Sequence, residues 1–122
     1  MALNYEEMGN TYWLMEDDEN AEKSYREALK RDARRVDSHL GLAKIDRREQ
    51  KFAAALAEAD AAVNIDPDRP DVHYVRGQIL LRLGRKKEAQ KEQQLAAGRE
   101  RLNERKAERG NVPSPELLQD SQ

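Results

Sequence analysis

The chain has 122 residues, a length that predicts one domain, and its 22 Lys and Arg nearly balance its 24 Asp and Glu. This balance argues against a general nucleic-acid-binding surface, and the absence of cysteine excludes disulfides and thiolate chemistry. No apolar run approaches the roughly 20 residues of a membrane span, and the first residues lack the pattern of a signal peptide. We therefore expect a soluble chain, cytoplasmic by default.

Two helices are predicted in the first part of the chain. Tyr5, Met8 and Tyr12 recur at helical spacing and predict a helix over about residues 2–15. A second apolar stripe predicts a helix over about 18–32. Between them, "EDDEN" offers Asp17 or Asp18 as the residue that caps the second helix.

Four further helices are predicted at about residues 36–49, 52–65, 70–83 and 86–109. The stretch "DPDRP" ends the fourth of the six helices and places Pro70 in the first turn of the fifth. Gly84 suits the C-terminus of that fifth helix. The helices are short and closely spaced, so each pair reads as a helical hairpin.

A period of 34 residues links these hairpins. Small residues recur three times at this interval in three separate positions, and such coincidence in register indicates an internal repeat. The positions, grouped by register, are Gly9, Ala43 and Gly77; Ala21, Ala55 and Ala89; and Ala28, Ala62 and Ala96.

With these residues the chain resembles the tetratricopeptide repeat family, whose pattern combines aromatic, leucine, glycine and alanine positions over 34 residues. The resemblance implies an all-α fold, a right-handed superhelix of stacked antiparallel helical hairpins. It divides the chain into repeats at 2–35, 36–69 and 70–103, followed by a helix extension and flexible tail at 104–122 within one domain. It also implies that Gly9 packs on Ala21, Ala43 on Ala55, and Gly77 on Ala89.

The sequence departs from the family pattern towards its middle and end. Asp46 occupies a tyrosine position and Ala59 an aromatic one, while Arg76 replaces a leucine and Gln93 an aromatic residue. We expect softer packing at these positions because a missing aromatic side chain removes core contacts.

His39 and His73 are the only histidines, and a catalytic or metal site would have to use them. Both occupy the aromatic position of their repeat, which favours a packing role at a partly exposed helix surface. No metal-ligand spacing, phosphate-binding glycine loop or nucleophile motif is present. We therefore predict no enzymatic activity, no cofactor and no metal.

Stacked hairpins form a concave surface, and in the resembled family the first helix of each repeat lines it. Acids (Glu6, Asp37 and Asp71) would form one lip, and bases the other, so that an acidic peptide could meet arginines and pack a side chain on Tyr74 or Leu40. The alternative that these charges are solvated or pair with one another stays open. The residues predicted to form the peptide groove are Asn10, Trp13, Leu40, Lys44, Arg47, Arg48, Tyr74, Gln78 and Arg82.

Some members of this family hold the terminal carboxylate of heat-shock chaperones with lysines, an arginine and asparagines. In the matching positions this chain has Asn10, which fits, but also Glu6, Gly41, Asp71 and Val75, which do not. A clamp of that kind is therefore not expected here. The sequence instead predicts a protein-binding scaffold for an unidentified protein or peptide.

Both ends of the array suggest alternatives. Trp13 and Leu14 would lie where a preceding repeat normally covers the surface, so a self-associating structural array, a homo-oligomer through uncovered terminal helices, is the alternative interpretation.

Residues 98–110 continue the last helix with mixed charges, which favours a solvated cap over a nucleic-acid-binding helix. Leu117 and Leu118 form a candidate docking motif in the tail. No nucleic acid and no membrane is expected as a partner.

Overall fold

Six α-helices make up the described part of the chain. The computed structural model describes residues 1–111, with side chains to residue 109. The predicted all-α array of helical hairpins is confirmed, and every predicted helix ends within two residues of the observed one. The helices are α1 (Ala2–Leu14), α2 (Asp18–Arg31), α3 (Val36–Arg48), α4 (Phe52–Ile65), α5 (Pro70–Arg82) and α6 (Lys86–Asn111).

The helix boundaries follow from local chemistry. Asp17 caps α2, because its Oδ1 accepts a hydrogen bond from the Asn20 backbone at 3.2 Å. Pro70 opens α5, where its missing N–H costs nothing. The turn inside each hairpin uses a left-handed residue at the same register, with φ of 59° at Glu16, 64° at Gln50 and 79° at Gly84. Only the third of these turns has the glycine that such a conformation favours.

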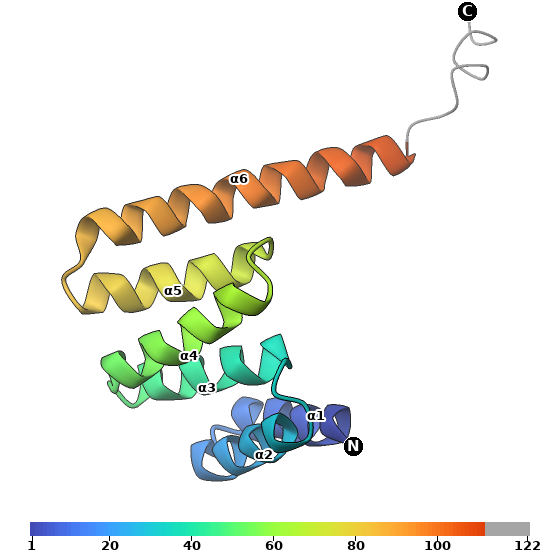
Figure 1. The fold of residues 1–122 in the computed structure, drawn as a ribbon, viewed down its shortest axis with the longest axis vertical. Coiled ribbons are helices and arrows are strands. Elements are labelled where there is room, and N and C mark those ends of the chain that lie inside the picture. The colour runs from blue at the N-terminus through green and yellow to red at the C-terminus, as the bar shows by residue number, and fades with distance from the viewer. Residues whose placement is uncertain (112–122) are drawn as a thin grey trace, which may run out of the picture.

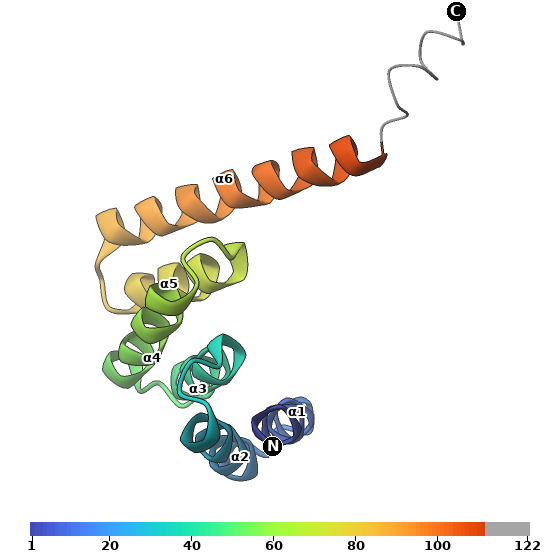
Figure 2. The ribbon, with the colours of Figure 1, turned by 45° about the vertical axis from the view of Figure 1, so that its right-hand side comes forward.

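The hairpins stack into one elongated array (Figures 1 and 2). Within each repeat the two helices pack antiparallel, and α2 packs on α3 as α4 packs on α5. The first helices of successive repeats also touch, α1 against α3 and α3 against α5. The pair α1 and α2 lies at one end of the array, and α6 lies at the other, where its C-terminal half projects past the rest of the molecule (Figure 1).

The recurring small residues are all buried, as close helix packing requires. Each of the alanines at these positions is at most 6% exposed, and both glycines are buried. Gly77 packs on Ala89, since a Cβ at Gly77 would lie 3.5 Å from the Ala89 carbonyl oxygen. The atoms nearest to Gly9 are those of the Tyr25 ring, 2.6 Å from where a Cβ would be, so the glycine makes room for this ring; the expected pairing of Gly9 with Ala21 stays a prediction.

Where the sequence departs from the family pattern, buried polar groups replace apolar bulk. Asp46 is 9% exposed, and burial followed by the nearby charge of Glu22 raises the pKa of its carboxyl above the ordinary value of 3.8. Arg76 donates hydrogen bonds to Asp60 Oδ1 at 2.7 Å and to Glu92 Oε1 at 2.9 Å. At Arg76 the interior therefore depends on paired charges as well as on apolar contacts.

Candidate functional site

Three neighbouring pockets follow the surface formed by α1, α3 and α5. The basic pocket, about 440 Å³, lies at the C-terminal ends of α3 and α5 and is lined by Arg47, Arg48, Gln50, Gln78, Leu81 and Arg82. The central pocket, about 120 Å³, is lined by Asn10, Trp13, Tyr25, Asp37, Leu40, Gly41, Lys44 and Asp71. The tyrosine pocket, about 410 Å³, is lined by Arg69, Pro70, Asp71, Tyr74 and Glu100.

Arg47 is the most unusual group in the basic pocket. Its Nη1 is buried and, among the residues that the structure describes, has no hydrogen-bond partner. Burial lowers the pKa of this guanidinium because the surroundings solvate the charge poorly. A buried cationic donor without an acceptor is costly, and an anion in the pocket would relieve that cost.

The other two arginines of the basic pocket differ from each other. Arg82 lies 4.7 Å over the ring of Phe52, and no salt bridge of Arg82 occurs within residues 1–109. Arg48 is already engaged, because its guanidinium lies 3.5 Å over the Trp13 ring and its Nε donates to Asp18 Oδ2 at 3.2 Å. Arg47 and Arg82 thus remain as the cations available to a ligand. Their position near helix C-termini suits positive charge.

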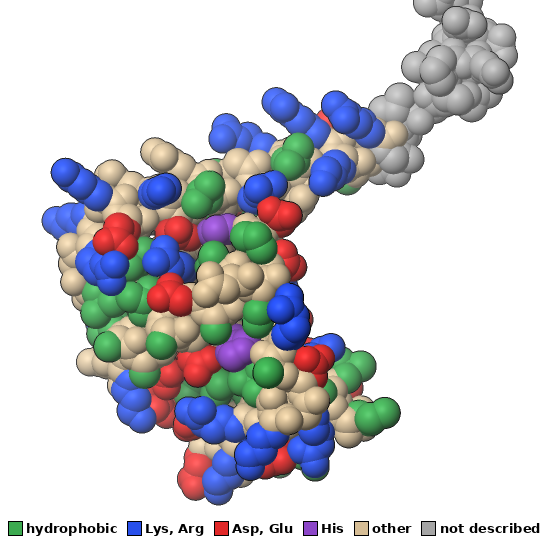
Figure 3. All heavy atoms as spheres, in the orientation of Figure 1, with side chains coloured by type: hydrophobic (Ala, Val, Ile, Leu, Met, Phe, Trp, Pro, Cys, Tyr) green, Lys and Arg blue, Asp and Glu red, His purple; other side chains and the backbone are tan. Residues whose placement is uncertain are grey.

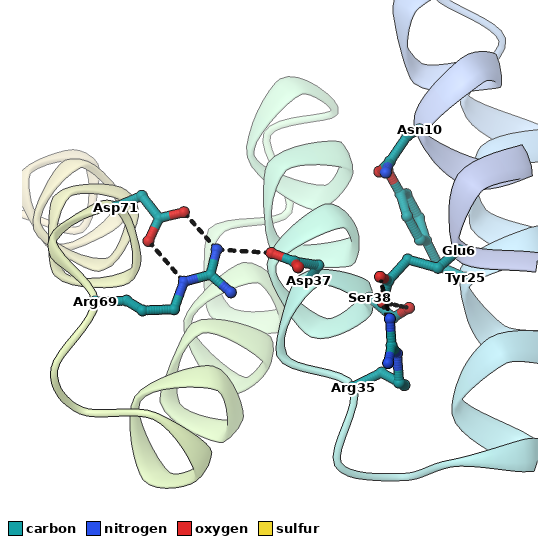
Figure 4. Close-up of polar contacts among 8 residues, drawn as sticks. All are labelled: Glu6, Asn10, Tyr25, Arg35, Asp37, Ser38, Arg69 and Asp71. Carbon is teal, nitrogen blue, oxygen red and sulfur yellow. Dashed lines mark hydrogen bonds and ion pairs between the residues drawn. The ribbon is translucent and has the colours of Figure 1, made fainter. Parts of the chain in front are cut away.

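At the opposite end of the same surface, an arginine partly compensates the expected acidic lip. Arg69 precedes α5, and its Nη2 lies 2.7 Å from both Asp37 Oδ1 and Asp71 Oδ2 (Figure 4). Burial opposes ionisation of Asp71, but the hydrogen bonds and charge of Arg69, the Val72 backbone N–H and the charge of Lys44 together outweigh it, so the pKa of Asp71 is lowered. Asp37 and Asp71, each with a side chain 50% exposed, therefore share one guanidinium, which compensates part of their negative charge.

The third predicted lip acid, Glu6, lies inside the structure. It is 4% exposed, and its carboxylate accepts from Arg35 Nη2 at 2.7 Å and from the Ser38 hydroxyl at 2.8 Å (Figure 4). The prediction that Glu6 lines the groove is wrong because this carboxylate joins the first repeat to the second. Arg35 and Arg69 stand 34 residues apart, each just before the first helix of a repeat, and each contacts an acid of the preceding first helix, Glu6 of α1 and Asp37 of α3. The 34-residue spacing of the two arginines is visible in the sequence.

The nine residues predicted for the groove all line one of the three pockets, but several are already occupied. Leu40 is 3% exposed and belongs to the core, so its prediction as an apolar anchor is wrong. Asn10 accepts a hydrogen bond from the Tyr25 hydroxyl at 2.6 Å. Trp13 is partly buried beneath Arg48, which contradicts its placement on an uncovered end.

The remaining predicted groove residues are accessible. Tyr74 is 55% exposed, and its hydroxyl accepts from Gln78 Nε2 at 2.9 Å. Lys44 is partly exposed in the central pocket. The accessible surface thus runs from the ring of Tyr74, past Gln78, to the arginines of the basic pocket.

The histidines take part in internal contacts rather than in a site. His39 Nδ1 lies 2.8 Å from Glu58 Oε2 and His73 Nδ1 lies 2.6 Å from Glu92 Oε2. The Nε2 atoms lie 3.0 Å and 2.6 Å from backbone carbonyl oxygens. His73 is 5% exposed, so its predicted partial exposure is wrong. Figure 3 shows both rings beside acidic side chains.

Metal-ligand clusters and membrane-spanning helices are both absent from the described residues. No group of three or more His, Cys, Asp or Glu side chains there could hold a metal ion. Likewise, none of the helices in residues 1–111 has both the length and the apolar character needed to cross a bilayer. The candidate docking residues Leu117 and Leu118 lie outside the described part of the chain.

Comparison with known proteins supplies independent evidence about the repeats. The family model described as tetratricopeptide repeat matches residues 2–35 and 70–101. A comparison with curated proteins gives no match.

Solved structures with the same arrangement of helices are numerous. The first TPR of Spaghetti (RPAP3) bound to the HSP90 peptide SRMEEVD is 24% identical, with a TM-score of 0.78 over 81% of this chain and 79% of that one. The TPR2B domain of yeast Sti1 in complex with pHsp70 is 20% identical, with a TM-score of 0.77 over 98% of this chain and 90% of that one. MamA is 16% identical, with a TM-score of 0.79 over 85% of this chain and 61% of that one. At such identities the likeness shows the fold alone.

Proposed function

Because this chain belongs to the tetratricopeptide repeat family, we propose that it binds a protein segment, specifically an acidic peptide, along the surface of α1, α3 and α5. An anionic side chain or terminus of the peptide would occupy the basic pocket. An apolar side chain of the same peptide would pack on Tyr74. The chain would act by binding alone, as a scaffold without catalysis.

The buried, unpartnered Nη1 of Arg47 is the observation that carries this proposal. A carboxylate can accept two parallel hydrogen bonds from one guanidinium, and this geometry favours arginine sites for acidic ligands. Arg82 supplies a second cation on the same pocket wall. Gln78 lies between the basic pocket and Tyr74, where its amide could hydrogen-bond the peptide backbone.

The ion pairs that Arg69 makes with Asp37 and Asp71 also favour a negatively charged ligand. Free carboxylates at Asp37 and Asp71 would repel an acidic peptide that extends towards Tyr74. Arg69 holds both of them in ion pairs, so this repulsion is reduced. The exposed ring of Tyr74 then provides apolar contact area at low conformational cost.

The proposed site differs from the one that the resembled chaperone binders would use. SRMEEVD, the peptide bound to the TPR of Spaghetti, is acidic, which agrees with the charge of the ligand proposed here. Of the clamp positions only Asn10 matches in type, and its amide oxygen is taken by Tyr25. We therefore place the anion at Arg47 and Arg82, at the C-terminal ends of α3 and α5.

Fluorescence anisotropy with labelled octapeptides tests this proposal. Each peptide carries Asp or Glu and one leucine at a varied position, and each has a neutral partner with Asn or Gln. The acidic set should bind, with an affinity that falls as salt increases. Arg47→Ala or Arg82→Ala should weaken binding at least about tenfold, whereas Arg26→Ala, which removes an arginine paired with Glu22 on α2, should not.

Two results would reject the proposal. Equal affinity of acidic and neutral peptides would show that charge does not select the ligand. Binding that is unchanged by Arg47→Ala and Arg82→Ala would show that any acidic peptide lies elsewhere.

A further inference from the structure

α1 lies at one end of the array (Figure 2). Its outer face forms a separate pocket. Its volume is about 500 Å³, and its lining is Asn4, Glu7, Met8, Thr11, Tyr12 and Met15. Met8 is 45% exposed and Met15 is 66% exposed. None of these residues lines the three pockets of the proposed peptide site. This pocket is therefore separate from the proposed peptide site.

The repeat register shows what such a face does elsewhere in this chain. Met8 corresponds to Leu42, which is 1% exposed, and to Arg76, which pairs with Asp60 of α4. Thr11 corresponds to Ile45 and Ile79, which are both fully buried. In the second and third repeats the same face is covered by the preceding repeat, where α2 packs on α3 and α4 packs on α5. The outer face of α1 thus has the position and the apolar character of a helix-binding surface.

Side-chain sizes at these internal interfaces specify the helix that fits. Gly41 of α3 receives the large ring of Tyr25. One repeat later, Val75 takes the place of Gly41 and the small Ala59 takes the place of Tyr25, and both belong to one core cluster. The corresponding residue of α1 is Glu7, which is larger than glycine. A helix covering α1 therefore needs a small residue opposite Glu7, as α4 has opposite Val75.

The negative charge around α1 indicates which residues should flank the apolar stripe of the covering helix. The first 22 residues contain seven acids and no Lys or Arg. Glu7 lines the pocket, and Glu16 directly follows Met15. Two copies of this face placed together would bring acids against acids, which is unfavourable. A covering helix with Lys or Arg beside its apolar stripe would have complementary charge.

The other end of this chain does not supply such a helix. In α6 the residues in register with Leu56 and Ala59 are Gln90 and Gln93, both exposed. A polar outer face is typical of a terminal repeat and leaves no apolar stripe for the α1 pocket. Head-to-tail packing of α6 onto α1 of a second copy is therefore disfavoured.

We propose that the outer face of α1 binds an amphipathic helix of a partner protein, with small apolar residues in its stripe and basic residues beside it. The partner helix continues the array as α2 does on α3 and α4 does on α5. This interface is independent of the acidic-peptide site. It also gives the face a role other than pairing with copies of the chain.

Anisotropy with a labelled helical probe tests the interface on the full chain. The probe is a stapled peptide with the sequence of residues 52–65, the helix that covers α5, flanked by two lysines at each end. It carries Asp60→Ala, because the partner of Asp60 on α5 is Arg76 and the residue of α1 in that register is Met8. It should bind saturably, and Met8→Glu should weaken binding at least about tenfold because a charge would be buried against the apolar stripe. Leu14→Glu is the matched control, since Leu14 is 81% exposed on the same helix but does not line the pocket.

Three probe comparisons complete the design. An Ala59→Tyr version of the probe should bind more weakly, because Glu7 leaves no room for a ring. A probe with glutamate flanks should also bind more weakly. Arg47→Ala in the protein should leave the affinity for the lysine-flanked probe unchanged, which separates this proposal from the peptide site.

Any of three outcomes would overturn the proposal. The first is absence of saturable binding while circular dichroism shows a folded chain and a helical probe. The second is an equal loss of affinity in Met8→Glu and Leu14→Glu. The third is sedimentation equilibrium that shows the chain alone as a dimer dissociated by Met8→Glu, which would assign the face to a second copy.

Discussion

The ring of Tyr25, in the first repeat, lies directly against Gly41, in the second. A Cβ at Gly41 would lie 2.4 Å from Tyr25 Cζ, so only glycine leaves room for the ring. Burial, followed by the charge of Glu6, raises the pKa of Tyr25 to about 12, which keeps its hydroxyl as a donor to Asn10. This one side chain joins α1, α2 and α3.

Gly41→Ala should therefore destabilise the fold by about 1–3 kcal/mol, the usual range for overpacking a filled interior. Urea denaturation followed by circular dichroism measures the change in the free energy of unfolding. Gly98→Ala is the matched control, because nothing lies within 4 Å of a Cβ at Gly98. That variant should be neutral or more stable, since alanine favours helix. A stable Gly41→Ala protein would contradict the contact with Tyr25.

Glu92 holds the buried polar cluster of the third repeat. Its two carboxylate oxygens contact His73 at 2.6 Å and Arg76 at 2.9 Å. Glu92→Ala therefore leaves His73 Nδ1 without its partner and Arg76 with Asp60 alone. We expect a loss of about 3–5 kcal/mol in the free energy of unfolding. Glu88→Ala removes an exposed pair with Arg85 and should leave the denaturation midpoint unchanged. Equal effects of the two variants would show that burial of the cluster adds nothing.

Asp46 should make stability depend on pH. The pKa of Asp46 is higher in the folded chain than in the unfolded chain, so folding favours the protonated carboxyl. The cost in stability of ionising Asp46 is therefore absent below pH 3.8 and grows as the pH rises through the folded-state pKa. Asp46→Asn should therefore stabilise the chain at pH 7 and do so less at pH 4. Thermal midpoints of both proteins at the two pH values provide the measurement. A stabilisation that is larger at pH 4 would have the wrong sign for this account.

The turns of the three hairpins offer a further comparison. Glu16 has a φ of 59°, which costs a residue with a Cβ about 1 kcal/mol, whereas Gly84 at 79° avoids this cost. Glu16→Gly should raise the thermal midpoint, and Gly84→Ala should lower it. A lower midpoint for Glu16→Gly would mean that the side chain of Glu16 contributes more than its backbone costs.

The helices and their pairing were predictable because they follow from periodicity, which is a local property repeated three times. Gly77 and Ala89 illustrate this, since both the spacing and the contact follow from the register. The turn glycine at Gly84 and the cap at Asp17 were predictable for similar reasons. Each depends on residues close in the sequence.

The site was harder to predict because long side chains form ion pairs and ring contacts with residues of other repeats. The guanidinium of Arg48 is stacked on the Trp13 ring, and the carboxylate of Glu6 is buried against Arg35. Neither choice follows from helical spacing, because an arginine or glutamate can reach several neighbours. The ion pairs of Arg69 with Asp37 and Asp71 were missed for the same reason, although the 34-residue spacing between Arg35 and Arg69 indicates that the two arginines have similar positions in the array.

Calorimetry of Arg47→Met, with and without an acidic peptide selected by anisotropy, tests the central claim most directly. If Arg47 is kept unpaired for an anionic ligand, the variant should melt at a higher temperature than the original chain when no peptide is present, because a buried N–H group without an acceptor is removed. The peptide should raise the midpoint of the original chain and leave that of the variant unchanged. A variant that melts lower and still responds fully to the peptide would contradict the account.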